Sequence, residues 1–190
     1  MARSTMTELI EEVRGMTNAG TADYTVGTIT FWADDDLQEF LDANRTDYKF
    51  LPLTSVPDYS GGTISIRDYK IPFTWYESGT ALGIVDNQGN AYGTALYSVD
   101  SARNMIRFTN NTLGSTVAVN INTFDLNQSA ADIWTRKAAH YAAAYDVSTD
   151  NHSLKRSQLV QQAREMSKHY ANLSYSTGAN GMISAERGDM

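Results

Sequence analysis

The sequence predicts an α+β protein. A helical bundle, formed by N-terminal helices and a C-terminal helical hairpin, carries an inserted antiparallel β-sandwich or barrel subdomain and ends in a flexible C-terminal arm. Apolar residues recur at steps of three and four near both ends of the chain, which is the spacing of one helix face. The middle of the chain alternates with period two between turn residues, and the last residues have no sustained period. The expected parts are residues 1–47, 48–124, 125–173 and 174–190 for the N-terminal helices, the β-subdomain, the hairpin and the arm.

The N-terminal part predicts two helices. Thr5 and Glu8 have the spacing of a capping box, and Gly15 is expected to end the first helix. The second helix is expected over residues 34–44. Its start holds three adjacent carboxylates, Asp34–Asp36, which the positive end of the helix dipole explains. A hard-cation site would need further ligands from elsewhere in the chain, and the sequence does not identify them.

The middle of the chain predicts five to seven short strands. Residues 63–67 and 116–121 alternate between the two faces of a sheet, and Gly- and Asn-containing turns separate such segments. Residues 86–90 superficially resemble a calcium loop, but they lack the ligand spacing and distal glutamate of an EF-hand, so a hairpin tip is expected. The frequent Tyr and Trp residues of the segment 59–97 are interpreted as core more readily than as a carbohydrate-binding surface.

The C-terminal part predicts two helices, over residues 125–145 and 154–173, joined by a polar turn. Asp125 and Ser129 can each cap the first helix, and Ser153 can cap the second. Two helices joined in this way are expected to pack as an antiparallel hairpin. One face of each helix is expected to form the contact, and its residues are Ala131, Trp134, Ala138, Tyr141, Ala142 and Tyr145 in the first helix and Val160, Ala163, Met166, Tyr170 and Leu173 in the second.

This C-terminal part also carries a resemblance. An Asp-Leu pair near a helix start, an Ala-rich helix with Trp134, the loop from Tyr145 to Gln158 and a helix ending Met166-Ser-Lys-His-Tyr170 are similar to the C-terminal half of head–tail connector (adaptor) proteins of tailed bacteriophages. The similarity extends more loosely to the N-terminal helices. The large β-insert departs from the compact helical members of that family.

The resemblance implies a structural protein of the virion neck, made in the cytoplasm of the bacterial host. Such a protein forms a homo-oligomeric ring, expected to be dodecameric, that joins the portal protein to the next neck or tail protein, a stopper or tail terminator. Genomic DNA passes through the ring during ejection without sequence-specific binding, and neither a cofactor, a metal nor a membrane is implied. The residues expected to contact the portal or a neighbouring subunit are Lys155, Arg156, Arg164, Tyr175, Met182 and Ile183.

The composition excludes several classes of protein. The absence of cysteine removes disulfide frameworks, thiol catalysis and thiolate metal sites. The sequence has no run of about eighteen apolar residues, so no transmembrane helix is predicted. The N-terminus does not resemble a secretory signal. The net charge of −7 argues against unspecific nucleic-acid binding. Because acidic residues outnumber basic ones by 15 to 8 in residues 1–124, a second hypothesis is that these carboxylates line the ring channel and repel DNA.

Catalytic motifs are missing from the sequence. It has no Gly-x-Ser-x-Gly elbow, no phosphate-cradling loop and no His-Glu-x-x-His pattern, so an enzyme is not expected. The histidines, His140, His152 and His169, are scattered over the predicted hairpin. Two alternatives to a connector remain, namely another neck protein such as a stopper or tail-completion protein, and a glycan-binding β-module with helical flanks.

Overall fold

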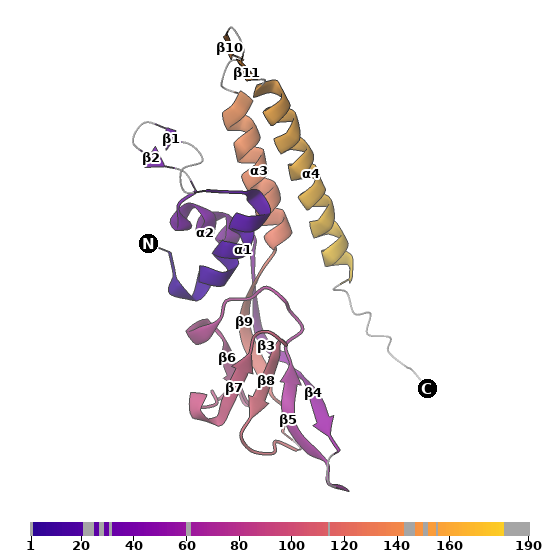
Figure 1. Ribbon diagram of the computed structural model, residues 1–190. Coiled ribbons are helices and arrows are strands. Elements are labelled where there is room, and N and C mark those ends of the chain that lie inside the picture. The colour runs from indigo at the N-terminus through magenta and orange to yellow at the C-terminus, as the bar shows by residue number, and fades with distance from the viewer. Residues whose placement is uncertain are drawn as a thin grey trace. The chain divides into compact units, whose positions relative to one another are not determined.

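A computed structural model describes residues 2–20, 25–26, 29–30, 32–59, 62–113, 115–142, 147–149, 152–154 and 156–180. These residues form a mixed α+β fold with α-helices and antiparallel sheets, as the sequence predicts (Figure 1). The chain divides into two compact units. A helical unit takes in Met1–Ala2, Ile10–Asn44 and Asp125–Met190, and a β-unit takes in Arg3–Leu9 and Arg45–Phe124. The β-unit therefore includes an N-terminal segment that the sequence assigned to the bundle.

The described helices are α1 (Thr7–Thr17), α2 (Asp34–Ala43), α3 (Leu126–Ala142) and α4 (Arg156–Asn180). Two short antiparallel pairs accompany them, β1 (Thr25–Val26) with β2 (Ile29–Thr30), and β10 (Val147–Thr149) with β11 (His152–Leu154). Helices α3 and α4 lie side by side, with β10 and β11 between them in the chain (Figure 1).

Helix α1 begins and ends differently from the prediction. A 3-10 turn, η1 (Ser4–Met6), precedes it, and the Thr5 hydroxyl donates to the Glu77 carboxylate at 2.6 Å instead of capping a helix. The helix continues past Gly15 to Thr17. It ends where Asn18 takes a φ of 49° and the Ala19 N–H donates to the Arg14 carbonyl at 3.1 Å. Asparagine tolerates this left-handed conformation, so it replaces the expected glycine in a Schellman ending.

Helix α2 begins where the sequence predicts, at Asp34. The Asp36 carboxylate accepts the Ala33 N–H at 3.1 Å, and Asp34 pairs with Arg14 of α1 at 2.7 Å. These contacts satisfy a first-turn donor and place negative charge at the positive end of the helix dipole. Among the described residues, no group of three or more Asp, Glu or His side chains gathers as a metal site would require.

Two predictions for the last part of the chain are wrong. The polar turn forms the β10–β11 hairpin, in which Val147 pairs with Leu154 and Ser153 with Ser148, so Ser153 does not cap a helix. Helix α4 also does not end at Leu173, because it continues to Asn180. The Ser174 hydroxyl donates to the Asp125 carboxylate at 2.6 Å, which holds this part of α4 at the start of α3. The arm expected from residue 174 is therefore helical as far as residue 180, and residues 181–190 lie outside the described part.

The β-unit contains seven described strands, within the predicted range. A three-stranded sheet has the order β3-β9-β6 and a four-stranded sheet the order β4-β5-β8-β7, and all pairings are antiparallel. The strands are β3 (Arg45–Pro52), β4 (Thr54–Asp58), β5 (Ser65–Lys70), β6 (Gly83–Val85), β7 (Tyr97–Asp100), β8 (Met105–Phe108) and β9 (Ala118–Phe124).

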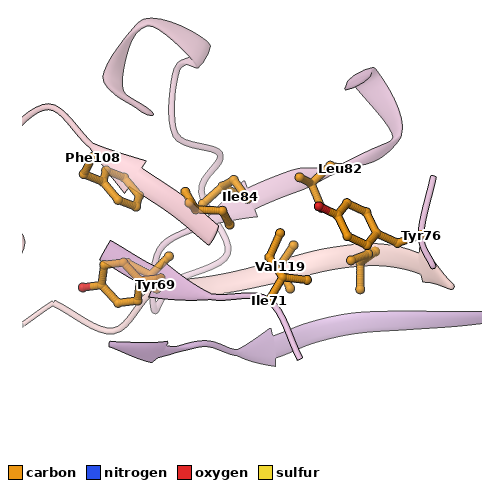
Figure 2. Packing of buried hydrophobic residues seen from close by; sticks show 10 residues of the cluster. Tyr69, Ile71, Tyr76, Leu82, Ile84, Phe108 and Val119 are labelled. Atoms are coloured by element: carbon orange, nitrogen blue, oxygen red, sulfur yellow. The ribbon is translucent and has the colours of Figure 1, made fainter. Parts of the chain in front are cut away.

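Side chains from both sheets share one apolar cluster. Figure 2 shows Tyr69 of β5, Ile84 of β6 and Val119 of β9 within it. The Tyr69 and Phe108 rings pack in a T-shaped arrangement with their centroids 5.7 Å apart, a geometry that aromatic pairs favour. Tyr69 and Tyr76 are almost completely buried. These tyrosines therefore belong to the core, as the sequence analysis favoured.

The expected hairpin tip after β6 is present. Asp86 accepts the backbone N–H groups of Gln88 and Asn90 at 2.8 and 2.9 Å, and Gly89 takes a φ of 85°. The Asn90 side-chain amide donates to the second carboxylate oxygen at 3.0 Å. Hydrogen bonds from Asn90, and then from Gln88, hold the pKa of Asp86 below its ordinary value. The carboxylate thus organises a turn, and the calcium interpretation is not needed.

Candidate functional site

The α3–α4 pair is held together along a narrow seam. Ala131 and Ala138 of α3 are buried, and the hydroxyls of Thr135 and Ser167 lie 2.9 Å apart across the pair. Ala163 is the one fully buried apolar residue among the described side chains of α4. Small residues at such a contact let two helices approach closely. Helices α3 and α4 pack on each other as predicted, but the predicted contact faces are only partly buried, since Ala142 and Leu173 are exposed.

Most of the described side chains of α4 face solvent. The helix has 25 residues, which corresponds to about 37 Å at 1.5 Å per residue. Leu159 and Leu173 remain 37% and 39% exposed, and Arg164 and Lys168 are exposed as well. Helices of this length in single globular domains usually bury a broad apolar stripe. Among the described side chains of α4, only Ala163 is fully buried, so the described part of the helix presents a long exposed surface.

Three side chains of the hairpin bind the last carbonyls of α1. Lys137 Nζ donates to the carbonyls of Thr17 and Asn18 at 3.0 Å each. Trp134 Nε1 and the Tyr170 hydroxyl both donate to the Met16 carbonyl, at 3.4 and 3.0 Å. The end of a helix carries unpaired carbonyls and partial negative charge, which an ammonium group complements.

Lys137 is a structural residue that the sequence analysis missed. Its side chain is 2% exposed, and its Nζ lies 5.0 Å from the centre of the Trp134 ring and 5.6 Å from that of Trp32. These distances allow cation–π attraction to both rings. The signal in the sequence was a lysine on the alanine-rich face of α3, three residues after a tryptophan and one before Ala138.

The structure does not bring the predicted contact residues together into one site. Arg164 is exposed on α4. Arg156 is the first residue of α4 and Tyr175 lies within it, but only their backbone positions are described. Lys155, Met182 and Ile183 lie outside the described residues. Of the predicted set, Arg164 is therefore the one whose side chain is described, and it lies exposed on α4 four residues before the exposed Lys168.

The histidines do not form a catalytic group in the described part of the chain. His140 is half-buried with its ring 5.7 Å from that of Tyr141, whereas His169 is exposed beside Tyr170. The predicted helix 154–173 places His169 near its end. In the structure His169 lies well before the end of the helix, because α4 continues to Asn180. His152 belongs to β11.

The β-unit has a polar groove of about 550 Å³ on its four-stranded sheet. The pairing of β4 with β5 skips Arg67, so this bulge places Arg67 and Asp68 together along the groove. Arg107 donates to both oxygens of Asp68 at 2.7 and 2.8 Å. The Arg107 hydrogen bonds hold the pKa of Asp68 below its ordinary value. The groove thus contains a paired carboxylate, which is a poor general base, and Asp58 and the hydroxyl side chains of Ser65, Ser98 and Thr109 line it as well.

Glu77 is the most strongly enclosed carboxylate of the β-unit. Its side chain is 5% exposed and accepts hydrogen bonds from Arg3 Nε at 2.9 Å, Thr5 Oγ1 at 2.6 Å and Asn122 Nδ2 at 3.3 Å. Burial disfavours the charged form, but these three hydrogen bonds outweigh it and hold the pKa of Glu77 below its ordinary value. The carboxylate therefore attaches the N-terminal segment of this unit to β9.

Comparison with known proteins identifies no relative, since no family model, curated protein or solved structure matches the chain. In the described part of the chain, none of the helices combines the length and the apolar character that crossing a membrane requires.

Proposed function

We propose that the chain is a non-enzymatic structural protein of the bacteriophage neck, a head–tail connector that assembles into a ring at the portal. The observation that carries the proposal is the α3–α4 pair, in which a 25-residue helix buries one apolar side chain among those described and leaves Leu159, Leu173, Arg164 and Lys168 exposed. A helix of this kind suits a subunit whose neighbours complete its packing. The resemblance of the same residues to connector proteins supports the proposal independently.

The proposed assembly has three parts. The α-helices form a bundle that is the body of a homo-oligomeric, dodecameric ring. The two sheets form a sandwich or open barrel that faces outward or toward the tail and meets the next neck protein, a stopper or tail terminator. Residues beyond the end of α4, with Met182 and Ile183, form an arm that orders against the portal protein or an adjacent subunit, helped by Lys155, Arg156, Arg164 and Tyr175. DNA passes through the central channel, and the virion is the site of action.

Electron microscopy of the purified chain tests the proposal. The chain is imaged alone and after mixing with the portal protein of a candidate phage, and the expected result is closed rings that stack on portal rings in coaxial particles. A chain that forms no ring in either sample, at concentrations up to the highest that remain soluble, contradicts the proposal.

The two alternatives predict different results. A stopper or tail-completion protein binds a preformed connector ring, so it would join portal particles only when that ring is present. A glycan-binding module would bind members of a glycan array through exposed aromatic side chains. The described aromatic side chains that favour this are Tyr48, stacked on Phe73 with ring centroids 4.8 Å apart, and the exposed Phe50 and Tyr59. Tyr69 and Tyr76 are buried and cannot contribute to such a surface.

A further inference from the structure

Helix α1 carries an acidic face that the described chain does not neutralise. Glu8, Glu11 and Glu12 are all exposed, and Gly15 extends the same face with open space above its Cα. None of the three carboxylates forms an ion pair or accepts a hydrogen bond from a described basic side chain. The nearest cation along the helix is Arg14. It pairs with Asp34 of α2 at 2.7 Å and donates to the Trp32 carbonyl at 2.9 Å.

Like charges at this spacing oppose helix formation. Glu8 and Glu12 are four residues apart and therefore neighbours on the helix surface, as are Glu8 and Glu11 at three residues. Such pairs destabilise a helix unless opposite charge lies nearby. The acidic face therefore favours contact with a cationic surface from outside the subunit.

Helix α4 carries the matching arrangement with the opposite sign. Arg164 and Lys168 are four residues apart and exposed, and neither forms an ion pair with a described carboxylate. Glu165, which follows Arg164 in the sequence, accepts a hydrogen bond from Gln161 at 3.0 Å. The basic pair on α4 and the Glu8–Glu12 pair on α1 both have a spacing of about 6 Å along their helix axes. When two such helices lie side by side, both ion pairs can form at once.

We propose that the acidic face of α1, defined by Glu8, Glu11 and Glu12, binds the basic pair Arg164 and Lys168 of a second copy of this chain. The inference rests on the proposed ring and assigns the subunit surfaces that form it. The two surfaces differ, so the contact is head-to-tail, and repetition of such a contact gives a closed ring when the rotation allows it. It also assigns the α1 carboxylates to a subunit contact, in place of a channel lining that repels DNA.

Charge reversal with reciprocal rescue tests this contact. Variant A carries E8K/E12K, so its α1 and α4 surfaces are both basic, and variant B carries R164E/K168E, so both are acidic. Self-association of the full chain is measured by analytical ultracentrifugation in about 0.05 M salt, where exposed charges are weakly screened. Each variant alone is expected to associate at least about tenfold more weakly than the wild type, because like charges then oppose each other across the contact.

An equimolar mixture of variants A and B is expected to recover association to within about threefold of the wild type, since every α1 then meets an α4 of opposite charge. Raising the salt to about 0.5 M is expected to weaken the mixture and the wild type alike. The matched control K49E/K70E reverses two exposed lysines of the β-unit and is expected to leave association unchanged. Because misfolded variants would not rescue each other, recovery in the mixture separates a lost contact from a lost fold.

The possible outcomes are distinct. A wild-type chain that stays monomeric in the ultracentrifuge and forms no rings in the microscope overturns the proposed function along with the contact. A wild-type chain that associates, with variants that associate equally well or a mixture that stays weak, overturns only the assignment of α1 and α4. If variant B keeps its self-association and loses portal binding, Arg164 and Lys168 contact the portal, and the assignment is likewise overturned.

Discussion

At the scale of single residues, Glu77 links the N-terminal segment of the β-unit to strand β9 through Arg3, Thr5 and Asn122. Replacing it in E77Q is expected to lower the free energy of unfolding by about 1–3 kcal/mol, because a buried charge-assisted network is broken. Urea denaturation at neutral pH measures this. The exposed E39Q variant is the control and is expected to unfold like the wild type.

The same carboxylate makes the stability depend on pH. Because the folded pKa of Glu77 lies below its ordinary value, its contribution is complete above that ordinary value. It is lost as the pH falls through the folded pKa, where the folded carboxylate also takes up a proton. The difference in unfolding free energy between the wild type and E77Q is therefore expected to shrink in acid. A difference that stays constant from neutral to strongly acidic pH would show that the charge of Glu77 does not contribute.

Lys137 gives a second prediction for a single residue. The K137M variant keeps the apolar stem of the side chain but removes the donor from the carbonyls of Thr17 and Asn18. It is expected to unfold more easily by about 1–3 kcal/mol, since the buried Thr17 carbonyl and the partly buried Asn18 carbonyl lose their donor. Thermal and urea denaturation measure the loss. K168M, an exposed lysine changed in the same way, is the control, and equal stability of both variants would contradict the role of Lys137.

At the scale of helices and strands, Asp125 connects the beginning of α3 to the later part of α4. One carboxylate oxygen accepts the Gln128 N–H at 2.9 Å, and the other accepts the Ser174 hydroxyl at 2.6 Å. D125A is expected to cost about 1–2 kcal/mol as a lost N-cap. It should also increase hydrogen exchange in α4 near Ser174.

The variant S174A separates these two effects. It removes the contact with α4 and leaves the cap of α3 in place, so faster exchange near residue 174 is expected with a smaller loss of global stability. If exchange near residue 174 is the same in D125A, S174A and the wild type, the contact does not hold this part of α4.

At the scale of the whole molecule, the proposed function predicts the effect of two truncations. A chain that ends at Ser174 loses the final turns of α4, whereas a chain that ends at Asn180 keeps α4 and loses only Met182, Ile183 and their neighbours. Both are expected to stay folded by circular dichroism and to lose co-sedimentation with portal rings. Unchanged co-sedimentation of the shorter chain would refute the role of the arm. Binding by the longer chain alone would assign the contact to residues 175–180.

The sequence by itself determined the class of the fold and the position of most elements. Helix α2, the alanine-rich helix α3, the Asp125 cap and the hairpin tip at Asp86 all follow from spacing and local chemistry, because their determining contacts lie within a few residues. The predicted contact residues stay a prediction, since only Arg164 among them has a described side chain.

Tertiary structure alone decided the features that depend on distant residues. Thr5 binds Glu77 instead of capping a helix, and Lys137 is buried against carbonyls 120 and 119 residues away in the sequence. Helix α4 continues past Leu173 to Asn180, and Ser174 within it donates to Asp125, which lies 49 residues away in the sequence. Local periodicity contains no information on such partners, so the free energy that fixes these positions appears only when the separate segments pack together.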